Sequence, residues 1–103
     1  MTALYLILAI VFEVAGTTSM KLSEGFTQIT PSIFIFVFYA FSFTFLTFTL
    51  KRLDLSLAYA VWAGLGTSLI AIIGVIFFHE PMTIIKALSL LLVILGVVGL
   101  ELA

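Results

Sequence analysis

The chain has 103 residues, of which 64% are hydrophobic and 9% are charged, with a formal net charge of −1 at pH 7. A soluble domain carries about 25% charged residues, so this composition excludes an ordinary soluble protein and predicts an integral membrane protein. The absence of cysteine excludes disulfides and thiolate metal sites, and no basic cluster indicates a nucleic-acid partner. We expect one domain, residues 1–103, that functions inside the membrane.

Polar and turn-forming residues divide the chain into four apolar segments, each long enough to cross a bilayer as a helix. We expect an all-α protein with spans at about 3–21, 31–50, 55–78 and 83–102. No basic segment precedes the first apolar run, so we interpret that run as a permanent span and not as a signal peptide. Both termini then lie on one side of the membrane.

Local residue chemistry predicts where the helices begin and end. Gly25 suits the left-handed position that follows a helix. Thr30 is the expected N-cap of the second span, with Pro31 at its first helical position. The run 79–81, His-Glu-Pro, should end the third span, and Thr83 should cap the fourth.

Glu13 is the only acidic residue in the interior of a predicted span. At ~1.5 Å per residue it lies about 15 Å from Ala3, near the centre of a ~30 Å hydrocarbon layer. An ionised carboxylate is costly there, so we expect it to be partly protonated, paired with a cation or exposed to a wet cavity. Each option suits a protein that exchanges cations for protons; a purely structural carboxyl is the alternative.

Steps of three and four residues along the first span bring Ala9, Ile10, Gly16 and Thr17 to the face of Glu13. The small residues leave room for a ligand to reach the carboxylate, although close helix packing explains them equally. Thr17 lies one turn from Glu13 and can donate a hydrogen bond to it or to a water.

The third span carries Tyr59 and Trp62 on one face. Tyrosine and tryptophan often form belts at the membrane surface, but Trp62 lies deeper than a belt requires. We therefore predict that Trp62 binds a cation with its ring face, whereas a belt position stays open for Tyr59. Gly64 and Gly66 weaken the helix locally and are a candidate hinge.

Three further polar side chains have two interpretations each. Tyr39 and Ser42 in the second span either orient Glu13 by hydrogen bonding or satisfy backbone carbonyls. Tyr5 lies one turn into the first span, either in an interfacial belt or at the mouth of a cavity.

A protomer of four short helices has little interior, so we expect a dimer. The fourth span places Ser89, Gly96 and Gly99 on roughly one face, where small residues allow close helix packing in lipid. Basic residues are balanced, with two on each side of the membrane, so the positive-inside rule specifies no orientation. This balance suggests an antiparallel, dual-topology homodimer that forms an inverted pair. The balanced residues are Lys51 and Arg52 on one side, and Lys21 and Lys86 on the other.

The sequence contains no phosphate-binding glycine loop and no Ser/His/Asp set at a plausible depth. We therefore expect no enzyme activity, no metal site and no cofactor.

Three segments resemble signatures of the small multidrug resistance family, and the likeness covers the whole chain in length and span order. The segments are Glu13–Thr27 in the first span, Tyr39–Phe43 in the second and Ala58–Gly66 in the third. The resemblance implies an antiparallel homodimer in the bacterial inner membrane that exchanges protons for cationic substrates. It implies that Glu13 binds proton or substrate in competition. It also implies a substrate pocket that includes Trp62, Tyr59, Tyr39, Ser42, Ala9, Ile10, Gly16, Thr17 and Tyr5.

The multidrug subtype, which exports quaternary ammonium and other lipophilic cations, is favoured over the guanidinium subtype. Guanidinium exporters typically carry Trp at the position of Gly16 and Gly at that of Ile10. The run 77–81, however, is more similar to the guanidinium subtype. A guanidinium or polyamine exporter is thus the alternative within the family, and a non-transporting regulatory membrane subunit is the alternative of a different class.

Overall fold

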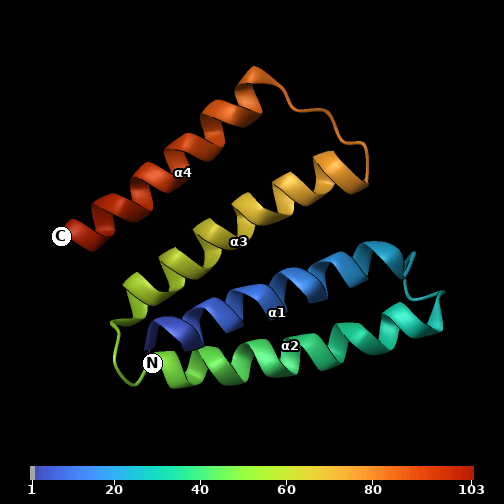
Figure 1. Ribbon diagram of the computed structural model, residues 1–103, viewed down its shortest axis with the longest axis horizontal. Coiled ribbons are helices and arrows are strands. Elements are labelled where there is room, and N and C mark those ends of the chain that lie inside the picture. The colour runs from blue at the N-terminus through green and yellow to red at the C-terminus, as the bar shows by residue number, and fades with distance from the viewer. Residues whose placement is uncertain (1) are drawn as a thin grey trace.

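The computed structural model describes residues 2–103, which form four α-helices joined by short connections (Figure 1). Each helix has the length and hydropathy needed to cross a membrane. The predicted all-α, four-span protomer is therefore confirmed, and its expected bounds agree to within two residues. The helices are α1 Thr2–Leu22, α2 Ile29–Thr49, α3 Leu55–Phe77 and α4 Ile84–Leu102.

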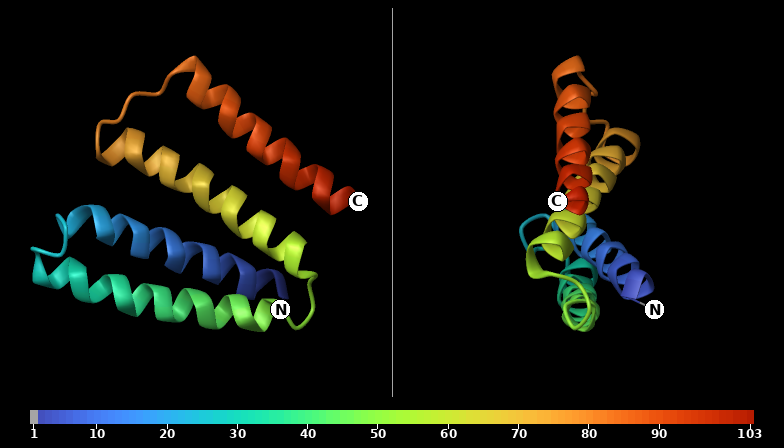
Figure 2. Two further views of the ribbon diagram at one scale, coloured as in Figure 1. Left: turned by 180° about the vertical axis from the view of Figure 1, so that it is seen from behind. Right: turned by 90° about the vertical axis from the view of Figure 1, so that its left-hand side faces the viewer.

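The helices lie side by side in one layer, in the spatial order α2, α1, α3, α4 (Figures 1 and 2). The molecule measures 43 × 35 × 17 Å, so its shortest dimension is not much more than one helix with its side chains. The start of α1, the end of α4 and the α2–α3 connection lie at one end of this layer. The other two connections lie at the opposite end, as four antiparallel spans require.

The α1 helix is the centre of the layer because it packs against both α2 and α3. Leu6, Ile10 and Val14 on one face of α1 form the buried apolar core. Ala9 is fully buried where α2 packs against α1, and there the Ser42 Oγ donates a hydrogen bond to the Ala9 carbonyl at 2.7 Å. Small side chains at this contact let the two backbones approach closely.

The α1–α2 connection is a tight left-handed turn. Gly25 has φ +70°, as predicted, and its neighbours Glu24 and Phe26 also have positive φ. The prediction that Thr30 caps α2 was wrong, since the helix begins at Ile29 with Gln28 at the N-cap position and no side-chain cap bond. Pro31 tolerates this earlier start because the first N–H groups of a helix have no intrahelical partner.

The α4 helix has no buried residue and packs mainly against α3. The two helices lie close together at Gly64, where an added Cβ would lie 2.6 Å from the Val97 Cγ2. The absence of a side chain at Gly64 therefore sets how closely α3 and α4 approach.

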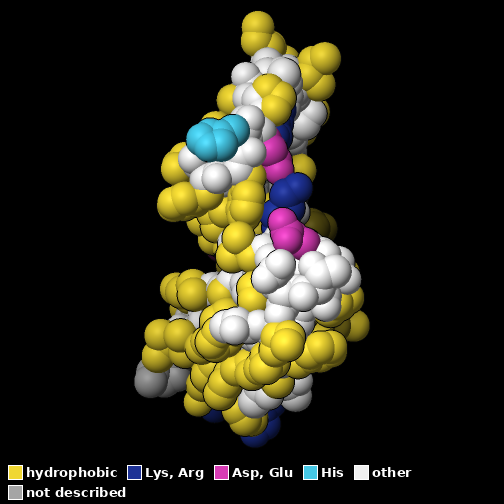
Figure 3. Space-filling view, turned by 90° about the vertical axis from the view of Figure 1, so that its right-hand side faces the viewer, with side chains coloured by type: hydrophobic (Ala, Val, Ile, Leu, Met, Phe, Trp, Pro, Cys, Tyr) yellow, Lys and Arg dark blue, Asp and Glu magenta, His cyan; other side chains and the backbone are white. Residues whose placement is uncertain are grey.

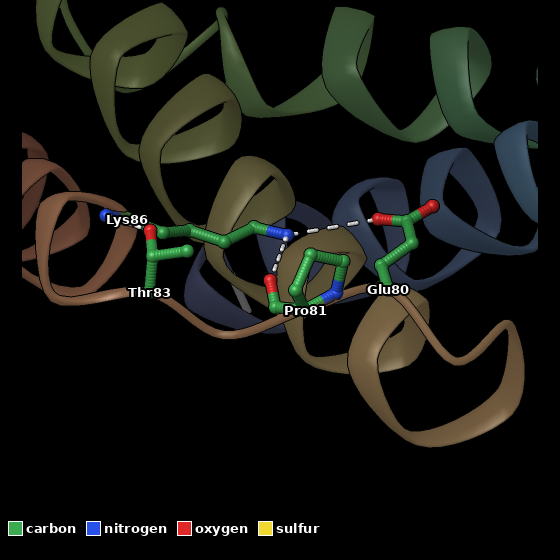
Figure 4. Close-up of polar contacts among 4 residues, drawn as sticks. All are labelled: Glu80, Pro81, Thr83 and Lys86. Atoms are coloured by element: carbon green, nitrogen blue, oxygen red, sulfur yellow. Dashed lines mark hydrogen bonds and ion pairs between the residues drawn. The ribbon is translucent and has the colours of Figure 1, made fainter.

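The α3–α4 connection is ordered by polar contacts (Figure 4). Thr83 accepts a hydrogen bond from the Lys86 backbone N–H at 3.0 Å, which confirms the predicted cap. The Lys86 Nζ bonds the Pro81 carbonyl at 3.3 Å and lies 3.7 Å from the Glu80 Oε1. At this end of the layer the charged side chains gather in a narrow column between apolar surfaces (Figure 3).

Gly64→Ala should destabilise the protein, because the new methyl group overlaps the stiff, β-branched Val97. We expect the free energy of unfolding to fall by about 1–3 kcal/mol, measured by thermal denaturation in detergent. The double variant Gly64→Ala/Val97→Ala removes the opposing methyl groups and should recover most of the loss. Equal instability of the single and double variants would contradict this packing.

Candidate cation-binding site

Glu13 borders a cavity of about 320 Å³ between α1 and α3. Its carboxylate is half-buried, and no basic side chain of residues 2–103 lies within 4.0 Å of it, since the single ion pair in that range joins Lys86 and Glu80. The cavity thus combines apolar walls with one uncompensated acid, an arrangement that suits a cationic ligand. It is lined by Glu13, Thr17, Trp62, Ala63, Gly66, Thr67 and Ile70.

Two hydroxyl groups in series reach the carboxylate. The Thr17 Oγ1 donates to the Glu13 Oε1 at 2.9 Å and lies 2.6 Å from the Tyr39 hydroxyl. Because Thr17 gives its single hydroxyl hydrogen to Glu13, Tyr39 is the donor to Thr17, which is a stronger acceptor than the Met20 Sδ 3.6 Å from the same Tyr39 hydroxyl. The donation from Thr17 agrees with the sequence analysis, and the two contacts connect the Tyr39 hydroxyl to Glu13 through Thr17.

Gly66 lies next to the Glu13 carboxylate on the α3 side. A Cβ at this position would lie 3.1 Å from the Glu13 Oε2, which is tighter than ordinary van der Waals contact. Any side chain here would push against the carboxylate, so glycine allows α3 to lie directly beside Glu13. The α3 helix runs unbroken through both Gly64 and Gly66.

Trp62 forms the aromatic wall of the cavity. Its ring meets those of Tyr59 and Phe43 nearly edge-on, with centroids 5.4 Å and 6.1 Å away. The Trp62 Nε1 is buried and has no hydrogen-bond partner in the described chain. A buried N–H without an acceptor is costly, and this group remains available to donate a hydrogen bond. Tyr59 remains 57% exposed and does not line the cavity.

Several of the predicted pocket residues lie in helix contacts within the protomer. Ala9 and Ile10 are buried, and Ser42 bonds the Ala9 carbonyl and does not contact Glu13. The space beside Gly16 is filled by the Tyr39 ring, since an added Cβ would lie 3.3 Å from the Tyr39 Cε1. Within one protomer, therefore, Ala9, Gly16 and Ser42 lie in the α1–α2 contact, whereas Ile10 lies in the buried core and borders a different cavity against α3.

The remaining predicted positions lie away from this cavity. Tyr5 borders a separate cavity with Lys51 and Arg52 at the other end of α1. Ser89, Gly96 and Gly99 are exposed on α4, and an added Cβ at either glycine would meet nothing within 4 Å. No cluster of potential metal ligands occurs within residues 2–103.

Sequence reasoning missed three lining residues, Ala63, Thr67 and Ile70. Steps of three and four residues from Trp62, as were used for Glu13, would have reached Gly66 and Ile70, and Ala63 and Thr67 continue the same face. Thr67 adds a polar side chain to the α3 wall.

The fold and the cavity define a multi-pass membrane protein with one uncompensated carboxylate in an aromatic-walled cavity. The family model described as Small Multidrug Resistance protein matches residues 1–93. The chain therefore belongs to the small multidrug resistance family, whose members are membrane transporters and not enzymes.

Individual relatives agree with this assignment. The chain is 54% identical to multidrug resistance protein EbrB of Bacillus subtilis, over 95% of this chain and 84% of the relative. It is 40% identical to quaternary ammonium compound-resistance protein QacC of Staphylococcus aureus, over 98% and 94%. It is 42% identical to nicotine metabolites export pump subunit NepA of Paenarthrobacter nicotinovorans, over 94% and 84%.

Thr17→Val should weaken cation binding about tenfold, because a hydrogen bond to a charged group contributes about 1.5 kcal/mol. Without the hydroxyl, the carboxylate can rotate away from the cavity and loses its link to Tyr39. Isothermal titration with tetraphenylphosphonium in detergent measures the effect. Thr17→Ser keeps the donor and should bind like the wild type, so equal losses in both variants would refute the positioning role.

Proposed function

We propose that the protein is a proton-coupled antiporter that exports lipophilic and quaternary ammonium cations. The observation that carries the proposal is the Glu13 carboxylate, which has no cationic partner within the described residues and borders an aromatic cavity. Such a carboxylate is stabilised either by a proton or by a bound cation. Proton and substrate therefore compete for one group, and this competition couples their movements in opposite directions.

The walls of the cavity favour a cation with apolar substituents. Trp62 offers a ring face that attracts positive charge, while Ala63 and Ile70 provide apolar surface. Burial of that surface stabilises large cations in a way that a small, strongly hydrated ion cannot match. The names of the relatives EbrB and QacC refer to multidrug and quaternary ammonium resistance, which supports the same class of cargo.

We further propose that the transporting unit is an antiparallel homodimer. A layer only 17 Å thick cannot enclose a substrate, so a second copy is needed to cover the open side of the Glu13 cavity. The α4 helix has no buried residue in the protomer, and its small residues Ser89, Gly96 and Gly99 suit a close helix contact. The balanced basic residues permit insertion in both orientations, which forms an inverted pair.

In this dimer the two Glu13 carboxylates face one shared cavity, which opens to each side of the bacterial inner membrane in turn. Trp62 and Tyr59 contact the cargo, and Tyr39 and Thr17 hold the carboxylate. The proposed substrate site also includes four residues of α1 and α2 near the carboxylate, namely Ala9, Ile10, Gly16 and Ser42. Gly64 and Gly66 are the positions in α3 where the helix can bend most easily during the switch.

Flux of cations into and out of liposomes tests this function with the purified chain alone. With an imposed proton gradient we expect transport of tetraphenylphosphonium, and much slower transport of guanidinium and spermidine. Trp62→Ala should reduce tetraphenylphosphonium flux about tenfold or more, because it removes a cation–π contact of about 0.5–2 kcal/mol together with apolar surface.

Glu13→Gln is the matched control, since it keeps the size of the side chain and removes its charge. We expect no coupled flux of any cation from this variant. Preferential transport of guanidinium or spermidine would instead support the alternative cargo. Absence of transport by the wild-type chain would support a regulatory subunit.

A further inference from the structure

A second cavity lies at the end of the layer that contains the α2–α3 connection. Its volume is about 690 Å³, and it shares no lining residue with the Glu13 cavity. Tyr5 and Glu13 are eight residues apart on α1, a distance of about 12 Å along the helix. The cavity is lined by Thr2, Tyr5, Phe48, Lys51 and Arg52.

The charge of this cavity is entirely positive. Lys51 and Arg52 are both exposed, and no acidic group of residues 2–103 lies within 4.0 Å of either. Asp54, the acid nearest in the sequence, forms no ion pair with them. Two uncompensated cations repel a cationic cargo, so we do not expect this cavity to bind the cargo on its way to Glu13.

The same side chains are suited to a phosphate group. Arginine offers a planar fork of donors that matches phosphate oxygens, and lysine adds a mobile point charge. The hydroxyl groups of Thr2 and Tyr5 are further donors on the α1 side. Four donor side chains thus surround a space large enough for a phosphate and its substituents.

The position of the cavity indicates where that phosphate comes from. Lys51 and Arg52 follow Leu50, the C-cap of α2, at the end of a membrane-spanning helix, which is the depth of lipid headgroups. The Tyr5 ring packs on Phe45 and Phe48, with centroids 6.1 Å and 5.6 Å away. This aromatic floor resembles the interfacial belts of membrane proteins, with the basic pair on its outer side.

We propose that this cavity binds the phosphate group of an anionic phospholipid. Tyr5 then contributes to a lipid site at the membrane surface, and its aromatic contacts hold the basic connection against the headgroup layer. The site is independent of transport, because it requires neither Glu13 nor a bound cargo.

Binding of short-chain phosphatidylglycerol to the full chain in an uncharged detergent tests the proposal, with native mass spectrometry as the readout. Each basic residue near an anionic lipid contributes roughly a fivefold change in affinity. We therefore expect Lys51→Gln/Arg52→Gln to weaken binding about thirtyfold, and each single variant about fivefold. The single variants keep the proposal testable if the double variant fails to fold.

The control variant Lys21→Gln/Lys86→Gln changes the net charge equally at the opposite end of the layer, and it should bind phosphatidylglycerol within about twofold of the wild type. Lys51→Arg keeps the charge and should also retain binding. Equal weakening in both double variants would show a general charge effect and overturn the proposal. Binding of phosphatidylcholine as tight as that of phosphatidylglycerol would also overturn it.

Competition between inorganic phosphate and phosphatidylglycerol distinguishes a lipid headgroup from free phosphate as the ligand. We expect no competition at millimolar phosphate if the headgroup and its acyl chains are held together. Competition that is lost in Lys51→Gln/Arg52→Gln would support the phosphate-binding chemistry and assign the ligand to the aqueous phase.

Discussion

The cost of a carboxylate in the hydrocarbon layer is the constraint on which the rest of this molecule depends. A carboxylate is costly in a hydrocarbon layer unless it is compensated, and the described residues offer Glu13 a hydroxyl donor but no cation within 4.0 Å. We propose that a proton or a cationic ligand supplies the compensation. A residue that always needs one of two positive partners is suited to exchange one for the other.

The need to compensate Glu13 is reflected both in the contacts of its carboxylate and in the shape of the whole protomer. Thr17, itself bonded to Tyr39, donates to one carboxylate oxygen, and Gly66 allows α3 to lie against the other. At the scale of the protomer, a single layer of helices leaves the cavity open on one side and leaves α4 without buried residues. We propose that a second copy of the chain covers both the open cavity and the exposed α4.

The four spans, the lone acid, its hydrogen bond from Thr17 and the placement of Trp62 beside the cavity could be predicted from the sequence, because they depend on hydropathy and helical period. The role of Gly16 could not, because the Tyr39 ring that fills its space comes from another helix. For Ser42 the sequence left two interpretations open, and its bond to the Ala9 carbonyl matches the backbone-carbonyl one; the choice depends on how closely α1 and α2 approach. The early start of α2 was missed because Pro31 is tolerated anywhere in the first helical turn.

Competition between proton and cargo for Glu13 is tested most directly by the release of protons into weakly buffered detergent solution when tetraphenylphosphonium is added to the purified protein. We expect the wild-type protein to release protons on binding, and Glu13→Gln neither to bind the cation tightly nor to release protons. Cation binding without proton release by the wild type, or proton release that persists in Glu13→Gln, would contradict it.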